Sequence, residues 1–193
     1  MARVVAAKRA LRKDIQKLVS SLSEEERRRQ SAAVTAKLLK TPQYVSSRRV
    51  AVYLNLPNEV ATRAIVQDVL ASKKLCFVPR FDPESDHMDM VRVYSMEDVQ
   101  NLPLTKYNVQ QPALEEIRED ALSTGGLDLV VVPGVAFTRC GQRLGHGKGY
   151  YDSFLARCPG PLFTVALAFS QQVVPELPTE PHDRIINLVL HPD

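Results

Sequence analysis

The sequence has few cysteines, no CxxC pair and no apolar run of the roughly 20 residues that a membrane-spanning helix needs. Its three cysteines, Cys76, Cys140 and Cys158, are odd in number and widely separated, which argues against a disulfide framework and favours a reducing compartment. Because Cys140 and Cys158 lack a histidine at ligand spacing, we interpret them as buried thiols rather than metal ligands. The chain is therefore expected to be soluble and intracellular, with no membrane partner.

Internal repeats, low-complexity segments and disordered linkers are also missing. The eight glycines and thirteen prolines are scattered through the 193 residues, so they mark loop boundaries but no linker. With 45% hydrophobic residues, the chain is long enough to bury one substantial core. We expect a single domain over residues 1–193.

The charge is only mildly basic. A net charge of +3 suits an anionic ligand but lacks the dense basic footprint of a nucleic-acid binder. RNA binding through the basic N-terminal segment is the weakest interpretation, because few aromatic residues interleave with the basic ones and Glu24, Glu25 and Glu26 follow closely. The same segment faintly resembles a mitochondrial leader, yet it is poor in serine and contains Asp14. We expect a cytoplasmic protein, with mitochondrial import as the minority alternative.

Hydrophobic periodicity predicts two N-terminal helices. Apolar residues recur at three- and four-residue steps from Val4 to Leu22, which is typical of an amphipathic helix. Ser23 and Glu26 then form a capping-box pattern, which begins a second helix that runs to about Leu39 and is ended by Pro42.

Apolar, β-branched runs predict strands in the rest of the chain. The predicted strands are 49–57, 75–81, 87–94, 127–133, 162–169 and 185–190. A helix over 62–74 joins the first two and completes a βαβ unit. This alternation predicts a three-layer α/β domain with a mixed, mostly parallel central sheet flanked by helices.

Ligands of such sheets bind at the carboxyl ends of the strands. Two loops are therefore favoured as the site, the one after Leu54 and the one after Val132. The second loop leads to the stretch RLGHGKGYYD at 143–152. Its spacing matches neither a Walker loop nor a dinucleotide-binding fingerprint, because Lys148 is followed by glycine and the glycines follow the pattern GxGxG.

The residue types in this stretch still favour anion binding. Glycines let backbone N–H groups approach oxyanions, and a helix beginning near Tyr150 would add its positive end. Arg143 and Lys148 suit phosphate oxygens, and Asp152 is an oxygen ligand of the kind that Mg²⁺ takes. The alternative is a turn whose glycines only permit a sharp bend, with tyrosines at the helix start that pack rather than bind. His146 is a weak candidate for a general acid or phosphate donor.

Five segments together resemble the 5-formyltetrahydrofolate cyclo-ligase family over nearly the whole chain. They read KRALRKDIQKL, SEEERRRQS, LNLPNEV, DHMDMVR and VVVPGVAFTRCGQRLGHGKGYYDSFL. The resemblance implies a three-layer α/β fold and the conversion of 5-formyltetrahydrofolate to 5,10-methenyltetrahydrofolate, which depends on ATP and Mg²⁺ and releases ADP and phosphate. In this reaction the γ-phosphoryl group is transferred to the formyl oxygen, nitrogen 10 attacks to close the ring, and phosphate leaves.

The resemblance also implies roles for individual residues. The nucleotide-binding positions are Lys8, Arg12, Arg143, Gly145, Gly147, Lys148, Gly149 and Tyr151. Arg143 and Lys148 are the implied catalytic residues, and Asp152 and Asp183 match the metal positions. The positions that line the folate are Leu54, Glu59, Tyr107, His146 and Tyr150. Without the resemblance, Lys8 and Arg12 would be interpreted as a solvated basic edge of the first helix, and Leu54, Glu59 and Tyr107 as packing residues.

Two positions depart from the family pattern. His146 stands where the family usually has arginine, which removes a permanent cation and could weaken nucleotide or folate binding. Tyr107 stands where some members carry tryptophan, which reduces the stacking area. The alternative to an active enzyme is therefore a folate- or nucleotide-binding protein that lost its activity at His146. For the active enzyme we expect a monomer whose partners are ATP and 5-formyltetrahydrofolate, including its polyglutamylated forms.

Overall fold

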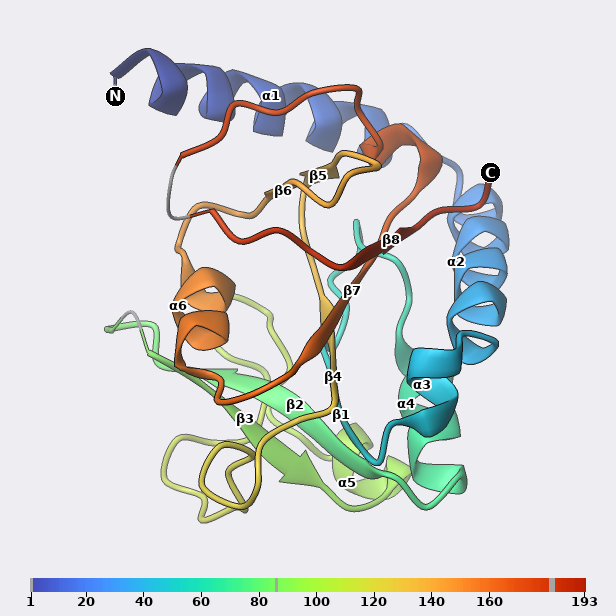
Figure 1. Ribbon diagram of the computed structural model, residues 1–193, viewed down its shortest axis with the longest axis vertical. Helices are drawn as coiled ribbons and strands as arrows, with labels where there is room; N and C mark the ends of the chain where they lie inside the picture. The colour runs from blue at the N-terminus through green and yellow to red at the C-terminus, as the bar shows by residue number, and fades with distance from the viewer. Residues whose placement is uncertain (1, 86, 181–182) are drawn as a thin grey trace.

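One six-stranded sheet runs through the computed structural model, which describes residues 2–85, 87–180 and 183–193. The strand order is β3-β2-β1-β4-β7-β8, and only the pairing of β2 with β3 is antiparallel (Figure 1). These strands are β1 Arg49–Val52, β2 Leu75–Phe81, β3 Met88–Val93, β4 Leu129–Val132, β7 Phe163–Leu167 and β8 Leu188–Leu190. A short hairpin of β5 Ala136–Phe137 and β6 Arg143–Leu144 stands apart from the sheet. The predicted mixed, mostly parallel sheet is confirmed.

Helices lie on both faces of the sheet, as the alternating sequence pattern predicted. They are α1 Ala2–Ser20, α2 Glu24–Leu39, α3 Pro42–Ser46, α4 Arg63–Ala71, α5 Met96–Gln100 and α6 Tyr150–Arg157, with a 3₁₀ turn η1 Ser170–Gln172. In Figure 1, α2, α3 and α4 stand on one side of the sheet and α6 on the other. None of the helices in the described part of the chain has both the length and the apolarity needed to cross a membrane.

The start of α2 follows its sequence signal only in part. The Ser23 hydroxyl accepts a hydrogen bond from the Glu26 backbone N–H at 3.1 Å, as predicted. The Glu26 carboxylate, however, accepts from the side chains of Arg29 and Gln30. These donors lie one turn along the helix, so the side chain of Glu26 points forward along α2 rather than back to the cap.

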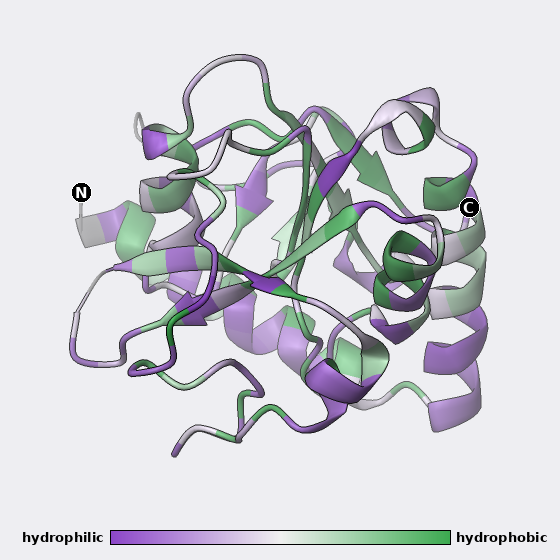
Figure 2. Ribbon diagram, turned by 90° about the horizontal axis from the view of Figure 1, so that it is seen from below, coloured by the Kyte–Doolittle hydropathy of each residue, from purple (hydrophilic) through white to green (hydrophobic). Residues whose placement is uncertain are grey.

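The strands alternate their side chains between two cores. Val50 and Val52 of β1 pack in the core beneath α2 and α4, whereas Ala51 belongs to the core on the opposite face, with Phe154 of α6. The central strands β1 and β4, which contribute to both cores, are nearly fully buried. In Figure 2 the central strands are coloured largely as hydrophobic.

All the predicted strands except β2 are shorter than the apolar runs suggested, and β1 and β8 show the reason. β1 ends at Val52 instead of residue 57, because the Tyr53 carbonyl accepts from the Thr62 hydroxyl at 2.6 Å and so leaves the sheet. β8 starts at Leu188 instead of residue 185, because the Ile186 N–H bonds to the carbonyl of Gly141 in the β5–β6 turn at 2.8 Å. In both places, a hydrogen bond to a neighbouring loop replaces the sheet ladder.

The cysteine prediction was wrong for one residue. Cys76 is buried and Cys158 is half-buried, but Cys140 is exposed in the β5–β6 turn. Its thiol lies 3.1 Å from the Thr138 hydroxyl. The turn projects from the sheet, so the apolar character of its flanking strands does not extend to Cys140.

Helix α1 lies across the carboxyl ends of the parallel strands, next to the β5–β6 hairpin (Figure 1). Ile15 and Val19 anchor α1, since they are only 4% and 2% exposed. The chain passes directly from β4 into β5 and from β6 into the loop before α6. The fold therefore brings the N-terminal helix to the same edge of the sheet as the glycine-rich loop.

Phe154 is the main anchor of α6, because it is fully buried in the core on that face. Replacing Phe154 by Ala should lower the free energy of unfolding by about 3 to 5 kcal/mol, through lost burial and a cavity. Urea unfolding followed by circular dichroism measures the change. Ile117→Ala is the control, since Ile117 is 99% exposed and its loss should matter by less than about 0.5 kcal/mol. A loss at Phe154 no larger than that of the control would contradict the assigned packing.

Candidate functional site

Two glycines shape the loop between β6 and α6. Gly147 has φ +107° and Gly149 has φ +73°, in the left-handed region that side chains rarely adopt. Gly149 is the N-cap of α6, so the chain turns sharply into Tyr150. The first N–H groups of a helix have no partner within the helix, and here they open toward the loop. The predicted turn and the predicted helix start are thus the same local structure.

Arg143 is held below this loop by two acceptors. Its guanidinium donates to Asp152 at 2.8 Å and to the Pro133 carbonyl at 3.2 Å, and its side chain is 5% exposed. The Nε of Arg143 and the hydroxyl of Tyr151 are buried with no hydrogen-bond partner among the described residues. Burial, followed by the negative charge of Glu59, raises the pKa of Tyr151 well above its ordinary value. Two unsatisfied donors therefore remain beside the glycine-rich loop.

Lys8 and Arg12 of α1 reach down to two different loops. The Lys8 ammonium lies 2.7 Å from Asp183 and 2.8 Å from Glu180. The Nε of Arg12 donates to the Gly145 carbonyl at 2.8 Å, and the guanidinium stands next to Gly147. The two cations are four residues apart on one helix face, as the sequence predicted, and they tie α1 to the edge of the sheet.

Lys8 keeps its charge in this position. Burial alone would lower its pKa, but the hydrogen bonds and negative charges of Asp183 and Glu180 outweigh burial and raise the pKa above 10.5. Lys8 as a whole is 8% exposed, so it is a cation held by protein groups and not a solvated edge residue.

Glu59 joins the two loops that the sequence favoured. One carboxylate oxygen accepts from the Leu56 N–H at 2.8 Å, and the other lies 3.1 Å from Nε2 of His146. The Glu59 side chain is 9% exposed, whereas that of His146 is 46% exposed. The loop after β1 and the loop before α6 therefore meet through a carboxylate and an imidazole.

Tyr150 and Tyr107 border a third loop, 82–85. The Tyr150 ring stacks on Phe81 with centroids 5.2 Å apart, and its hydroxyl donates to the Asp82 and Ser85 carbonyls at 3.3 and 3.2 Å. Tyr107 is 60% exposed beside Lys106, which lies 3.6 Å from Glu84. Tyr150 contacts this loop directly, whereas Tyr107 is exposed next to a lysine that pairs with the loop.

Leu54 and Lys148 differ in their surroundings. Leu54 is half-buried and packs against the core under α2 and α4. Lys148 is exposed in the glycine-rich loop, and the described residues offer it no hydrogen bond or ion pair. Of the predicted cations, Lys148 is thus the one that remains available, while Lys8, Arg12 and Arg143 are engaged with protein groups.

The side chain of Asp152 contacts the backbone next to Asp183. Asp152 accepts the N–H of Arg184, the residue after Asp183, at 3.4 Å, and its other oxygen is paired with Arg143. Within residues 2–85, 87–180 and 183–193, no three His, Cys, Asp or Glu side chains form a cluster that could hold a metal alone. Two carboxylates fit Mg²⁺ as part of a shell that phosphate oxygens and water complete.

Glu180 was not singled out in the sequence analysis, although the structure places its carboxylate on Lys8. Its only sequence signal is an acid three residues before Asp183 in a proline-rich segment. Phe81 was treated only as the end of a strand, and its stacking on Tyr150 depends on strand register. Neither pairing could be derived from local spacing.

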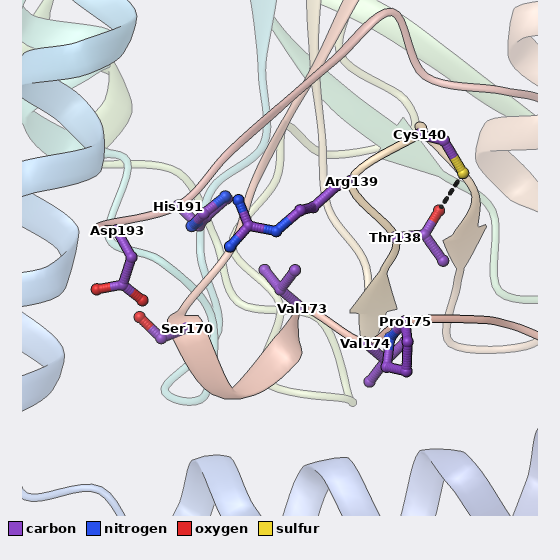
Figure 3. A pocket seen from close by; sticks show the side chains of 9 residues that line it. All are labelled: Thr138, Arg139, Cys140, Ser170, Val173, Val174, Pro175, His191 and Asp193. Atoms are coloured by element: carbon purple, nitrogen blue, oxygen red, sulfur yellow. Dashed lines mark hydrogen bonds between the residues drawn. The ribbon is translucent and has the colours of Figure 1, made fainter.

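A separate pocket of about 540 Å³ lies outside this set of residues. Figure 3 shows it between the β5–β6 turn, η1 and the C-terminal segment, with the Arg139 side chain extending toward His191. It is lined by Thr138, Arg139, Cys140, Ser170, Val173, Val174, Pro175, His191 and Asp193. No predicted site residue lines it, so we place the candidate site at the glycine-rich loop.

Known proteins match this chain over nearly its whole length. A model of the 5-formyltetrahydrofolate cyclo-ligase family matches residues 4–192. The chain is 44% identical to the 5-formyltetrahydrofolate cyclo-ligase of Mus musculus over 98% of this chain and 96% of that protein. The solved structure of Aquifex aeolicus 5,10-methenyltetrahydrofolate synthetase aligns with a TM-score of 0.78 at 34% identity, and covers 95% of this chain and 88% of that one. A synthetase structure from Mycoplasma pneumoniae shares the fold, with a TM-score of 0.74 at 21% identity.

The left-handed conformation of Gly149 can be tested without changing any contact. A Cβ at Gly149 would meet no atom within 4 Å, so a substitution acts through the backbone alone. Gly149→Val should lower the free energy of unfolding by about 1 to 2 kcal/mol, and Gly149→Asn by less, because Asn tolerates this conformation. Urea unfolding compares the two variants. Equal losses for Val and Asn would show that residue 149 does not require a left-handed backbone.

Proposed function

Because this chain belongs to the 5-formyltetrahydrofolate cyclo-ligase family, we propose that it converts 5-formyltetrahydrofolate to 5,10-methenyltetrahydrofolate, consuming ATP and releasing ADP and phosphate. One observation of the structure supports this proposal above the others. Arg12 of α1 binds the glycine-rich loop and Arg143 of β6 binds the first turn of α6, while Lys8 of α1 lies on Asp183. His146 of the same loop contacts Glu59. A nucleotide and a folate can thus bind side by side.

The nucleotide binds at the glycine-rich loop in this proposal. The contributing residues are Lys8, Arg12, Arg143, Gly145, Gly147, Lys148, Gly149 and Tyr151. Backbone N–H groups at the start of α6 and the unsatisfied donors of Arg143 and Tyr151 suit phosphate oxygens. Lys148 adds a cation that forms no hydrogen bond or ion pair with the described residues.

The reaction needs an activated formyl group, because an amide carbonyl is a poor electrophile. Transfer of the γ-phosphoryl group to the formyl oxygen supplies that activation, nitrogen 10 then attacks the carbon, and the ring closes as phosphate leaves. Lys148 and Arg143 stabilise the charge of the transferred group, which is the main demand that phosphoryl transfer places on a protein. Covalent help from the protein is not required.

The folate binds along the loops on the other side of the motif. Leu54, Glu59, Tyr107, His146 and Tyr150 are its proposed contacts. Glu59 is nearly buried and can accept hydrogen bonds from the amino edge of the pterin, while the Tyr150 ring offers apolar surface. The Glu59–His146 contact must open or shift when Glu59 takes that role.

In this proposal Asp152 and Asp183 would hold Mg²⁺. The ion would supply charge neutralisation on the phosphates. In the structure both carboxylates are paired with cations, Asp152 with Arg143 and Asp183 with Lys8. Binding of the nucleotide can therefore free the carboxylates for the metal, while the cations turn to the phosphates.

We also propose a single domain over residues 1–193 that acts as a monomer in the cytoplasm and accepts polyglutamylated folate. Three scattered, unpaired cysteines support a reducing compartment. The plant relative from Arabidopsis thaliana is named mitochondrial, so fractionation of cells that produce this protein decides between the two compartments.

A direct assay tests the reaction. Purified protein is mixed with ATP, Mg²⁺ and 5-formyltetrahydrofolate, and the methenyl product is followed by its absorbance together with ADP. The proposal predicts one ADP per methenyl product. Binding of both ligands without ADP release, restored to turnover by His146→Arg, would instead favour the inactive binding protein.

Lys148→Ala should abolish turnover and leave the fold intact, because an exposed loop lysine contributes little stability. The same assay measures turnover, and thermal unfolding reports the fold. Lys40→Ala is a matched control, since Lys40 is an exposed lysine at the end of α2. Turnover of the Lys148 variant near that of the control would remove Lys148 from the reaction.

Asp152→Asn should raise the Mg²⁺ concentration needed for half-maximal turnover by at least about tenfold, since even the outer partners of a metal can cost that much affinity. Titration of turnover with Mg²⁺ measures the shift. Asp14→Asn is the control, because Asp14 is exposed on α1. An unchanged Mg²⁺ requirement would show that Asp152 serves Arg143 and not the metal.

A further inference from the structure

The Lys8 ammonium is shared by two carboxylates with different surroundings. Glu180 lies 2.8 Å and Asp183 2.7 Å from Nζ, and their side chains are 24% and 17% exposed. Asp183 also accepts the backbone N–H of Glu180 at 2.7 Å, through the same oxygen that binds Lys8. Asp183 is thus fixed to the chain as well as to Lys8, and it can hold the ammonium in place without the Glu180 side chain.

The Glu180 carboxylate therefore adds a second negative charge at Lys8. One positive group faces two negative groups, so the ammonium presents no net positive charge to an incoming polyphosphate. An ammonium has three N–H donors, and two are taken here. A polyphosphate that accepts more than one hydrogen bond from the Lys8 ammonium must displace Glu180 or Asp183.

We propose that Glu180 is a positioning residue that acts through Lys8, holding the ammonium when the nucleotide is absent and competing with its phosphates when it binds. This inference rests on the proposed function, in which Lys8 binds the nucleotide and Asp183 turns to the metal. In this scheme Glu180 competes with the phosphates for Lys8 throughout the cycle. Glu180 thus weakens nucleotide binding, and its ion pair with Lys8 forms again when ADP leaves.

The competition predicts a gain in affinity from the loss of a carboxylate. Glu180→Gln keeps the size of the side chain and an acceptor oxygen but removes its charge. Calorimetric titration with ADP should show a Kd about three- to fivefold lower than that of the wild type, the effect of a partly exposed ion pair. The decrease should appear both with Mg²⁺ and with a chelator present, because Glu180 is not a metal ligand. In turnover, KM for ATP should fall while kcat does not rise.

The matched control is Glu176→Gln. Glu176 is an exposed glutamate four residues earlier in the same segment, so its substitution changes the net charge equally. The control should leave the Kd for ADP at the wild-type value. If both variants lower the Kd alike, the effect is general charge and the inference is overturned. Thermal unfolding of each variant confirms that the comparison is made between folded proteins.

A second pair of variants tests the route through Lys8. In a Lys8→Met background, Glu180→Gln should no longer lower the Kd for ADP, because the competing pair is gone. A decrease that persists in this background would overturn the inference, as would an unchanged or higher Kd for Glu180→Gln alone. A wild-type protein that binds no ADP would overturn the nucleotide site itself, and this inference with it. The two failures are thus distinguishable.

Discussion

The contact of α1 with the carboxyl edge of the sheet is the interaction on which the site depends. Lys8 binds Glu180 and Asp183, and Arg12 binds the glycine-rich loop through the Gly145 carbonyl. Ile15 and Val19 fix the same helix in the core. Without these anchors, the first helix would be a solvated amphipathic segment and its cations would not face the start of α6.

The charged side chains of the candidate site form ion pairs with one another. Lys8 pairs with Asp183 and Glu180, Arg143 with Asp152, and Glu59 lies against His146. Paired carboxylates spare the protein the repulsion of several cations around one loop, which would destabilise the fold. The same pairs can exchange partners, since phosphates suit the cations and a divalent metal suits Asp152 and Asp183. In the proposed function, the contacts that stabilise these loops are therefore also the ones that would set the affinity for the nucleotide.

Much of the fold could be predicted from sequence because its signals are local. Apolar runs gave the buried strands, the Ser23 cap gave the start of α2, and glycines gave the turn into Tyr150. The ends of β1 and β8 could not be predicted, since they depend on hydrogen bonds from Thr62 and to Gly141 across the structure. The exposure of Cys140 could not be predicted either, since it depends on the β5–β6 turn projecting from the sheet.

The candidate site was predictable as a set of residues but not as a set of contacts. The resemblance named Lys8, Asp183 and Glu59, yet neither the pairing of Lys8 with Glu180 nor that of Glu59 with His146 follows from spacing, because the partners are far apart in the chain. A structure of the protein with ADP and Mg²⁺ tests the account most directly. It should show the Lys8 ammonium and the Arg143 guanidinium on phosphate oxygens, with Asp152 and Asp183 turned to the metal. ADP bound elsewhere, with Lys8 still on Asp183 and Arg143 still on Asp152, would contradict it.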